Sequence, residues 1–118
     1  MSYKFKQTQP NPYFPQIMDV EPEEVLEATP QVLLIDVREI HEFTGELRHV
    51  PQSKLIVLST LADKLNTLPK DKTIVFICRS GGRSAQAAAF CKAHGFHETY
   101  NMRGGMLEWN ELQLPVEK

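Results

Sequence analysis

One stretch of this sequence combines the residue types that nucleophilic chemistry needs. An apolar run over residues 74–77 leads directly into Cys78, and two glycines and two arginines follow it closely. Glycines let a loop curl tightly, so that backbone N–H groups of the loop and of the following helix can converge on one point. A cysteine sulfur over such a cradle, with guanidinium groups nearby, is favoured as the nucleophilic thiolate, and no general base is required. We predict Cys78 as the catalytic nucleophile and the residues after it as the substrate-binding loop: Arg79, Ser80, Gly81, Gly82, Arg83 and Ser84.

The alternative for each cysteine is a packing role, since free cysteine is among the most buried residue types. For Cys78 we favour chemistry, because a core cysteine would not need the glycines and arginines that follow it. Cys91 lies in an alanine-rich segment, where packing is favoured over the role of a second, resolving thiol. The cysteines and the four histidines lack the spacing of metal ligands, so neither a metal nor another cofactor is expected.

Composition bounds the size of the protein and its partners. The chain has 118 residues, 42% hydrophobic and 24% charged, as expected for one compact domain. A formal net charge of -2 provides no overall attraction for nucleic acid or for an acidic membrane surface. No apolar run reaches the roughly 20 residues that cross a bilayer, and the polar N-terminus does not resemble a signal peptide. Two cysteines are too few for a disulfide framework. These features predict a cytoplasmic protein that binds neither nucleic acid nor membranes.

The elements that must position Cys78 alternate along the chain. Apolar runs and short β-type segments predict five strands, at residues 17–20, 32–35, 55–58, 73–77 and 98–100. Start and stop residues predict helices at residues 22–28, 61–68 and 82–94, and a tight turn at Gly104 and Gly105 leads into a last helix around Trp109. This order indicates a three-layer α/β domain over residues 16–118, with a central, mostly parallel five-stranded sheet and helices on both faces. Ligands of such sheets bind at the C-terminal ends of the strands, where Cys78 is expected.

Two further segments flank this framework. Residues 1–15 hold three prolines and show no helical or strand period, so we predict an extended N-terminal arm, anchored by Tyr13 and Phe14. Asp36 and Arg38 follow the second predicted strand. They either support the active-site loop with hydrogen bonds or pair only with each other, and we favour support.

Five motifs occur in a fixed order along this one short domain. They are Asp36-Val37-Arg38-Glu39 with Glu42-Phe43, His49-Val50-Pro51, the loop of residues 78–84, Gly95-Phe96, and Met102-Arg103-Gly104-Gly105-Met106 with Trp109. Together they resemble the motifs of the rhodanese family, over roughly residues 17–112. The resemblance implies that Cys78 takes a sulfane sulfur from a small donor such as thiosulfate. It further implies that Cys78 carries this sulfur as a persulfide and passes it to a thiol, cyanide or a protein acceptor.

The sequence departs from the family pattern around its second motif. Arg48 and Gln52 stand where glycines commonly flank the His-Pro turn, and Ser53 stands where alanine is usual. The N-terminal arm also extends beyond the minimal family domain.

Two alternatives to a sulfurtransferase acting on small donors remain. A sulfur-relay or regulatory module of the same family would bind one partner and show little activity on small donors, although regulatory members usually lack the cysteine. Cysteine phosphatases and arsenate reductases also place a thiolate in a loop between strand and helix. Their loop is one residue longer before its arginine, and Ser84 stands at that position here. The smaller cradle favours a sulfane sulfur over a tetrahedral oxyanion.

Overall fold

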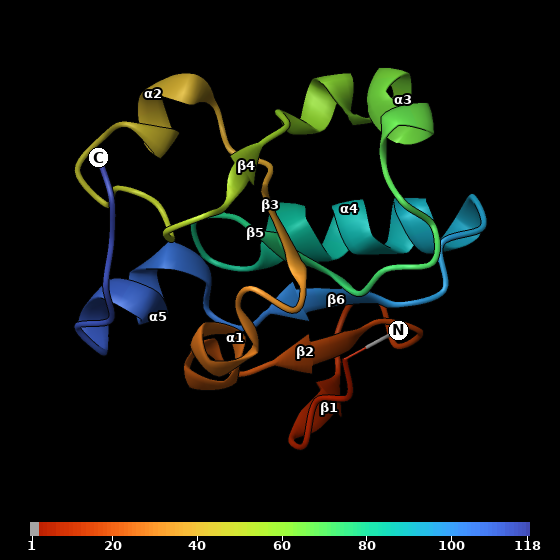
Figure 1. The fold of residues 1–118 in the computed structure, drawn as a ribbon, viewed down its shortest axis with the longest axis horizontal. Coiled ribbons are helices and arrows are strands. Elements are labelled where there is room, and N and C mark those ends of the chain that lie inside the picture. Colours follow the sequence, from red (N-terminus) through yellow and green to blue (C-terminus); the bar gives the residue numbers. More distant parts are fainter. Residues whose placement is uncertain (1–2) are drawn as a thin grey trace.

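The computed structural model describes residues 3–118, which form a sheet covered by helices (Figure 1). Within these residues the sheet has six strands, in the spatial order β1-β2-β6-β5-β3-β4. Their bounds are β1 Thr8–Pro10, β2 Met18–Val20, β3 Leu33–Asp36, β4 Lys54–Leu55, β5 Ile74–Ile77 and β6 Thr99–Met102. All neighbouring strands run parallel except β1, which is antiparallel to β2. The predicted α/β class with a mostly parallel sheet is therefore confirmed.

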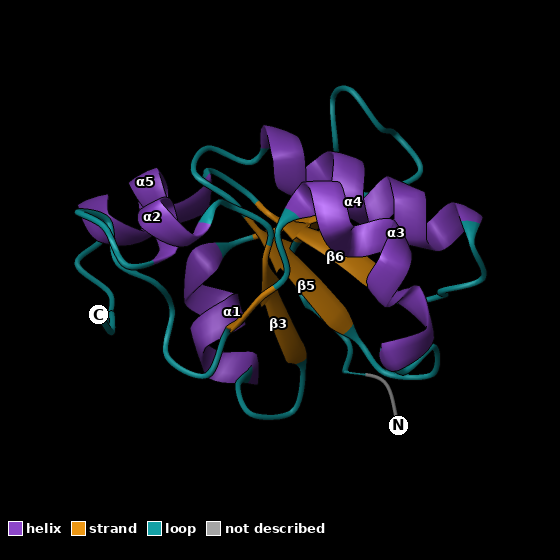
Figure 2. Ribbon diagram, turned by 90° about the horizontal axis from the view of Figure 1, so that it is seen from above, coloured by secondary structure: helices purple, strands orange, loops and turns teal. Residues whose placement is uncertain are grey.

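Helices cover both faces of the sheet, as predicted. Those of the described residues are α1 Pro22–Ala28, α2 Ile40–Phe43, α3 Leu61–Lys64, α4 Gly82–Ala93 and α5 Gly105–Glu111. One core lies between the sheet and helices α3 and α4 and includes Ile35 of β3 and Ala88 of α4, whereas the other lies between the sheet and helices α1 and α5 and includes Leu34 of β3 and Trp109 of α5. Figure 2 shows these two pairs of helices on opposite faces of the sheet. Successive residues of a strand point to opposite faces, so the continuous apolar runs of β3 and β5 fill both cores. Within residues 3–118, no helix combines the length and the apolar character needed to cross a membrane.

The predicted arm adds a strand to the sheet, which corrects the predicted number of five. Thr8–Pro10 pairs with β2, with Gln9 opposite Asp19. Three exposed residues that end in proline carry no period, so this strand depends on its pairing partner and not on a local pattern. Phe14 packs against the core as predicted, whereas Tyr13 is 85% exposed, contrary to its predicted anchoring role.

Most other elements lie close to their predicted positions. α1 has the predicted bounds, and α4 ends one residue before the predicted end. The strand predicted at residues 55–58 is confined to Lys54–Leu55, because Leu58 already begins a 3₁₀-helix. The helix predicted at residues 61–68 is α3 followed by the 3₁₀-helix Leu65–Thr67. α2, with four residues, is too short to show a helical period and is not predicted from the sequence.

Cys78 directly follows the central strand β5 and therefore lies where the C-terminal ends of the parallel strands meet. β5 ends at Ile77, opposite Asp36 at the end of β3. The N–H of Val37 donates to the carbonyl of Ile77, which holds the two chain segments together just beyond the strands. Cys78 therefore follows a strand that is hydrogen-bonded on both sides, by β3 and by β6.

Candidate active site

Cys78 lies in a tight loop between β5 and α4 and is 1% exposed. The N–H of Gly81 donates to Cys78 Sγ at 3.1 Å, and Ser84 Oγ lies 3.1 Å from the same sulfur. Gly81 has a φ of 107°, in the left-handed region that glycine adopts without strain, and this allows the loop to close and turn into α4. A backbone N–H and a hydroxyl close to one sulfur are suited to hold a negatively charged sulfur species.

The start of α5 holds the active-site loop in place through backbone hydrogen bonds. The N–H of Met106 donates to the carbonyl of Cys78 at 2.9 Å, and the N–H of Leu107 donates to that of Arg79 at 3.0 Å. Gly105, with a φ of 59°, lies so close to the loop that a Cβ atom there would be 2.5 Å from backbone atoms of Cys78 and Arg79. The predicted tight turn is present, but its role in positioning the loop was missed. The pair of glycines before the Trp109 helix was the available signal.

Arg83 binds the carboxylate of Glu42, so its guanidinium group is not free to face the active-site loop. Its Nη1 and Nη2 donate to Oε1 and Oε2 of Glu42, each at 2.8 Å. The hydrogen bonds from Arg83 lower the pKa of Glu42 to about 2, and those bonds raise the pKa of Arg83. A donor anion would therefore have to compete with Glu42 for this guanidinium. Glu42 was not among the predicted site residues, because its partner lies far away in the sequence.

Arg79 is the more accessible of the two loop arginines. Its side chain is exposed and makes no ion pair within residues 3–118. It lines a hollow of about 250 Å³ together with Arg38, His41 and Glu42. Ser80 and Gly82 of the predicted substrate-binding loop are exposed, whereas Gly81 and Ser84 are buried.

Asp36 and Arg38 form a buried ion pair at the end of β3. Arg38 Nη2 lies 2.7 Å from Asp36 Oδ2, and both residues are at most 1% exposed. Arg38 also donates to the carbonyls of Glu42 and Arg48. In the part of the chain that the structure describes, neither side chain bonds directly to residues 78–84. A supporting role of this pair would therefore act through Glu42, which Arg38 holds by its backbone and which in turn binds Arg83.

Cys91 and His49 are both buried packing residues. Cys91 is fully buried within α4, and burial raises the pKa of its thiol to about 11. His49 stacks on Phe43 with 3.7 Å between ring centroids, and its Nδ1 lies 2.9 Å from the Phe43 carbonyl oxygen. Among residues 3–118, no group of three or more His, Cys, Asp or Glu residues is arranged to hold a metal ion.

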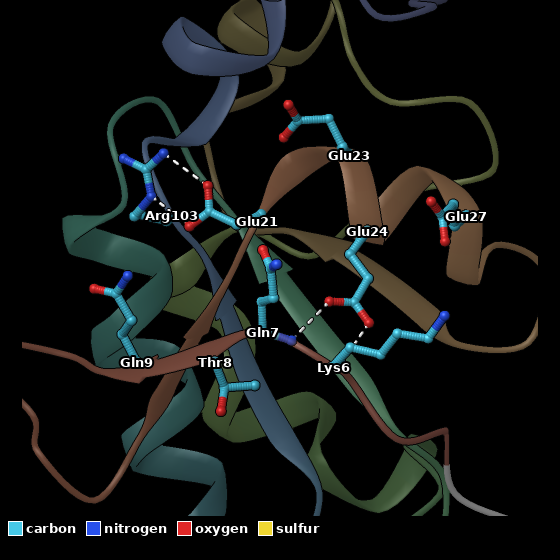
Figure 3. Close-up of a pocket in the computed structure, with 9 residues that line it drawn as sticks. All are labelled: Lys6, Gln7, Thr8, Gln9, Glu21, Glu23, Glu24, Glu27 and Arg103. Atoms are coloured by element: carbon cyan, nitrogen blue, oxygen red, sulfur yellow. Dashed lines mark hydrogen bonds and ion pairs between the residues drawn. The ribbon is translucent and has the colours of Figure 1, made fainter.

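A larger hollow, of about 1000 Å³, lies away from Cys78 between the arm and α1 (Figure 3). The backbone N–H groups of Lys6 and Gln7 donate to the Glu24 carboxylate, which ties the arm to α1. At the other end, Arg103 bonds both carboxylate oxygens of Glu21, and this lowers the pKa of Glu21. The two bonds to Glu24 hold the arm against α1, whereas the Arg103–Glu21 pair joins the end of β6 to the start of α1.

Two buried polar residues behind the loop were also missed by the sequence analysis. Asn101 Oδ1 contacts Ser84 Oγ, and Asn101 Nδ2 donates to Asp19 Oδ1 at 2.8 Å. Asn101 lies on β6 and Asp19 on β2, and neither residue is part of the five motifs. Their only signal was the presence of a polar residue at a position that a parallel sheet normally buries.

Comparisons with known proteins find sulfurtransferases and rhodanese-related structures that are similar to this chain. YtwF of Bacillus subtilis, which is provisionally named a sulfurtransferase, is 41% identical over 92 residues, covering 78% of this chain and 86% of YtwF. The thiosulfate sulfurtransferase GlpE of Pseudomonas syringae is 34% identical over 77 residues, covering 65% of this chain and 71% of GlpE. The crystal structure of a rhodanese-related protein from Thermoplasma volcanium matches with a TM-score of 0.75 and 30% identity, over 84% of this chain and 96% of that one.

The family comparison covers the sheet apart from β1, the loop that holds Cys78, and helices α1 to α5. The model of the family described as the rhodanese-like domain matches residues 17–112, from the residue before β2 to the residue after α5. With the fold and the loop geometry described above, this match shows that the chain belongs to the rhodanese-like domain family.

Proposed function

We propose that this protein is a sulfurtransferase that carries a sulfane sulfur on Cys78 as a persulfide. The observation that carries the proposal is the position of Cys78 Sγ, which lies in a tight loop with the N–H of Gly81 directed at it. The names of YtwF and GlpE support the same chemistry. Both cysteines are unpaired, which suits a reducing compartment, and we place the protein in the cytoplasm.

The reaction divides into two displacements at sulfur. In the first, the Cys78 thiolate attacks the outer sulfur of thiosulfate, a bond forms from Sγ to that sulfur, and sulfite leaves with the electron pair of the broken sulfur–sulfur bond. The terminal sulfur of the persulfide then carries the negative charge. In the second, an acceptor thiolate or cyanide attacks this terminal sulfur, and Cys78 leaves as the thiolate. The protein gains and loses no electrons over the cycle.

We assign the attraction of an anionic donor first to Arg79. It is exposed beside the loop and has no carboxylate partner in the described residues, whereas Arg83 already binds Glu42 through two hydrogen bonds. We assign to the buried pair Asp36 and Arg38 a supporting role, because Arg38 holds the backbone of Glu42. In this arrangement Ser80, Gly82 and Arg83 form the outer side of the cradle, and Gly81 and Ser84 its inner side.

The same contacts make the phosphatase alternative less suitable. A phosphatase needs its loop arginine to bind the phosphoryl oxygens from within the loop. Here the guanidinium of Arg83 lies on Glu42 instead, and Ser84 occupies the next position. The relay alternative is chemically compatible, because the same persulfide can pass its sulfur to a protein acceptor.

Sulfur transfer from thiosulfate to cyanide, measured with two matched cysteine variants, tests the proposal. Cys78→Ser should lose the activity and keep the fold, because a hydroxyl is far less nucleophilic than a thiolate at neutral pH. Cys91→Ser, which changes a buried packing residue, should keep most of the activity.

Retained activity in Cys78→Ser would refute the assignment. A folded but inactive Cys91→Ser would instead indicate a second catalytic thiol. If the wild type is inactive with thiosulfate but accepts sulfur from a persulfidated protein, the relay alternative replaces the small donor.

A further inference from the structure

A chain of buried polar side chains connects Cys78 with the N-terminal arm. Ser84 Oγ lies 3.1 Å from Cys78 Sγ and 2.5 Å from Asn101 Oδ1. Asn101 on β6 is the register partner of Asp19 on β2, and its Nδ2 donates to Asp19 Oδ1 at 2.8 Å. Asn11 of the arm donates to the same oxygen at 2.9 Å. Asn101 is 1% exposed and Asp19 7%, so water competes little for these bonds.

The chemistry of these groups fixes the direction of each bond. A carboxylate only accepts hydrogen bonds, so Asp19 orients the NH₂ group of Asn101 toward itself. The carbonyl oxygen of Asn101 must then face Ser84, and it too can only accept. Ser84 has one hydroxyl proton and two acceptors within reach, Asn101 Oδ1 and Cys78 Sγ. The hydroxyl can donate its hydrogen bond to only one of these two acceptors at a time.

The geometry points to Asn101, oriented by Asp19, as a positioning residue that holds the Ser84 hydroxyl and thereby limits its stabilisation of the Cys78 thiolate. This inference rests on the proposed function in that it takes Cys78 as the nucleophile. When Cys78 is a thiol, its S–H donates to Ser84 Oγ while the hydroxyl donates to Asn101. When Cys78 is a thiolate, Sγ keeps the Gly81 N–H, and the Ser84 hydroxyl can donate to Sγ only by leaving the buried oxygen of Asn101 without a partner.

The persulfide resolves this competition. Once Sγ is bonded to a second sulfur, the negative charge moves to the terminal sulfur and Sγ becomes a weak acceptor. The Ser84 hydroxyl can then return to Asn101 Oδ1, and every buried group has a partner again. Asn101 therefore disfavours the free thiolate relative to the loaded persulfide, which promotes the uptake of sulfur.

Other charged groups also act on Cys78, and the test must leave them unchanged. The charged and titratable groups on the loop and on the elements around it are Arg79, Arg83 and Lys92 of the loop and α4, Asp36 and Arg38 at the end of β3, His41 and Glu42 of α2, Asp19 of β2, Arg103 after β6, and Glu108 and Glu111 of α5. Most are held in ion pairs, Arg83 with Glu42, Arg38 with Asp36, and Arg103 with Glu108 and Glu21. A substitution of Asn101 by an uncharged residue adds or removes no formal charge and breaks none of these ion pairs, and Asp19 keeps its hydrogen bond from Asn11.

The ultraviolet absorbance of the Cys78 thiolate, followed against pH in a Cys91→Ser background, measures the effect directly. Asn101→Leu has a similar size and cannot accept, so the hydroxyl is free to serve Sγ. The midpoint should fall by about 0.5 to 1 pH unit, the equivalent of one hydrogen bond. Ser84→Ala should raise the midpoint. In the Ser84→Ala background, Asn101→Leu should cause no further shift, because the hydroxyl that it releases is absent.

Asn110→Leu is the matched control. Asn110 is a partly buried asparagine that donates to the carbonyls of Leu47 and Met106, and its loss should leave the midpoint unchanged. If Asn101→Leu does not fold, Asn101→Ala carries the same expectation. An unchanged midpoint in the Asn101 variant, or an equal shift with and without Ser84, would overturn the inference. Because the readout is ionisation, it is independent of sulfur transfer, whose failure would refute the proposed function alone.

Discussion

Gly105→Ala should disable the active site without touching any residue that contacts a substrate. A Cβ atom at position 105 would lie 2.5 Å from the carbonyl carbon and oxygen of Arg79 and from the carbonyl oxygen of Cys78. Ordinary contacts of a Cβ atom begin near 3.4 Å. Because the blocking atoms are backbone, no side chain can rotate away, and the loop and α5 must move apart by about 1 Å.

The structure allows the size of this effect to be estimated. The φ of 59° costs an alanine roughly 1 to 2 kcal/mol. Separation of α5 from the loop weakens two hydrogen bonds, from Met106 to Cys78 and from Leu107 to Arg79, each worth about 1 kcal/mol. We therefore expect a loss of about 2 to 4 kcal/mol of folding free energy. A displacement of about 1 Å at reacting atoms commonly costs about a hundredfold in rate.

Gly95→Ala provides the control for backbone strain. Gly95 also has a left-handed φ, of 93°, but a Cβ atom there would meet only the Lys70 side chain, at 3.5 Å. This variant should lose about 1 to 2 kcal/mol of stability and keep its kcat/KM. Urea unfolding and steady-state sulfur transfer, measured on both variants, separate strain from displacement. If folded Gly105→Ala keeps the wild-type kcat/KM, α5 does not position the loop and the reasoning fails.

Arg79→Ala is expected to lower kcat/KM for thiosulfate about ten- to hundredfold, and Arg79→Lys less, because lysine keeps the charge but loses the planar fork. Kinetics at two ionic strengths check this, since added salt should slow the wild type more than the alanine variant. Glu42→Gln should cost about 1 kcal/mol at pH 7, a figure discounted for solvent because Arg83 is 37% exposed. The folded-state pKa of Glu42 is lowered from 4.5 to about 2, so this stabilisation is complete above 4.5 and is lost as the pH falls toward 2. The urea midpoints of wild type and Glu42→Gln should therefore converge over that window, and a constant gap would contradict the ion pair. Gln52 has a φ of 72°, and Gln52→Gly should raise stability by about 0.5 to 1 kcal/mol, because the relieved strain exceeds the added chain entropy. A thermal midpoint that does not rise would argue against strain at this position.

Local patterns in the sequence predict much of this fold. The continuous apolar runs before Asp36 and Cys78 identify the two central strands, because only strands buried on both faces carry such runs. Pro22 marks the first turn of α1, and its helix has the predicted bounds. β1 and α2 are missed because neither contributes a buried apolar face that a sequence pattern would show: all three residues of β1 are exposed, and α2 has no buried residue.

The candidate site is only partly predictable, because some of its contacts join residues far apart in the chain. The cysteine, the glycines and the start of α4 are local, and they lie where the sequence indicates. The partner of Arg83 lies 41 positions away, at Glu42, so an arginine expected to face the donor binds a carboxylate instead. Asn101 and Asp19 are 82 positions apart and meet only because β6 and β2 are neighbours in the sheet.

One departure from the family pattern gains a physical meaning from the structure. Arg48 and Gln52 stand where the family commonly has glycine, and both have left-handed backbones, with φ of 57° and 72°. The chain thus keeps the glycine-type turn around His49 and accepts strain at two residues. The side chain of Arg38 donates a hydrogen bond to the backbone carbonyl of Arg48, and this bond helps to maintain the turn.

The mass of the intact protein after treatment with thiosulfate tests the central claim most directly. We predict a gain of one sulfur, about 32 Da, in the wild type and in Cys91→Ser, and its loss on adding cyanide or dithiothreitol. Cys78→Ser should gain nothing under the same conditions. A wild-type protein that gains no sulfur from thiosulfate or from a protein persulfide, or a gain that persists in Cys78→Ser, would contradict the assignment of Cys78 as the sulfur carrier.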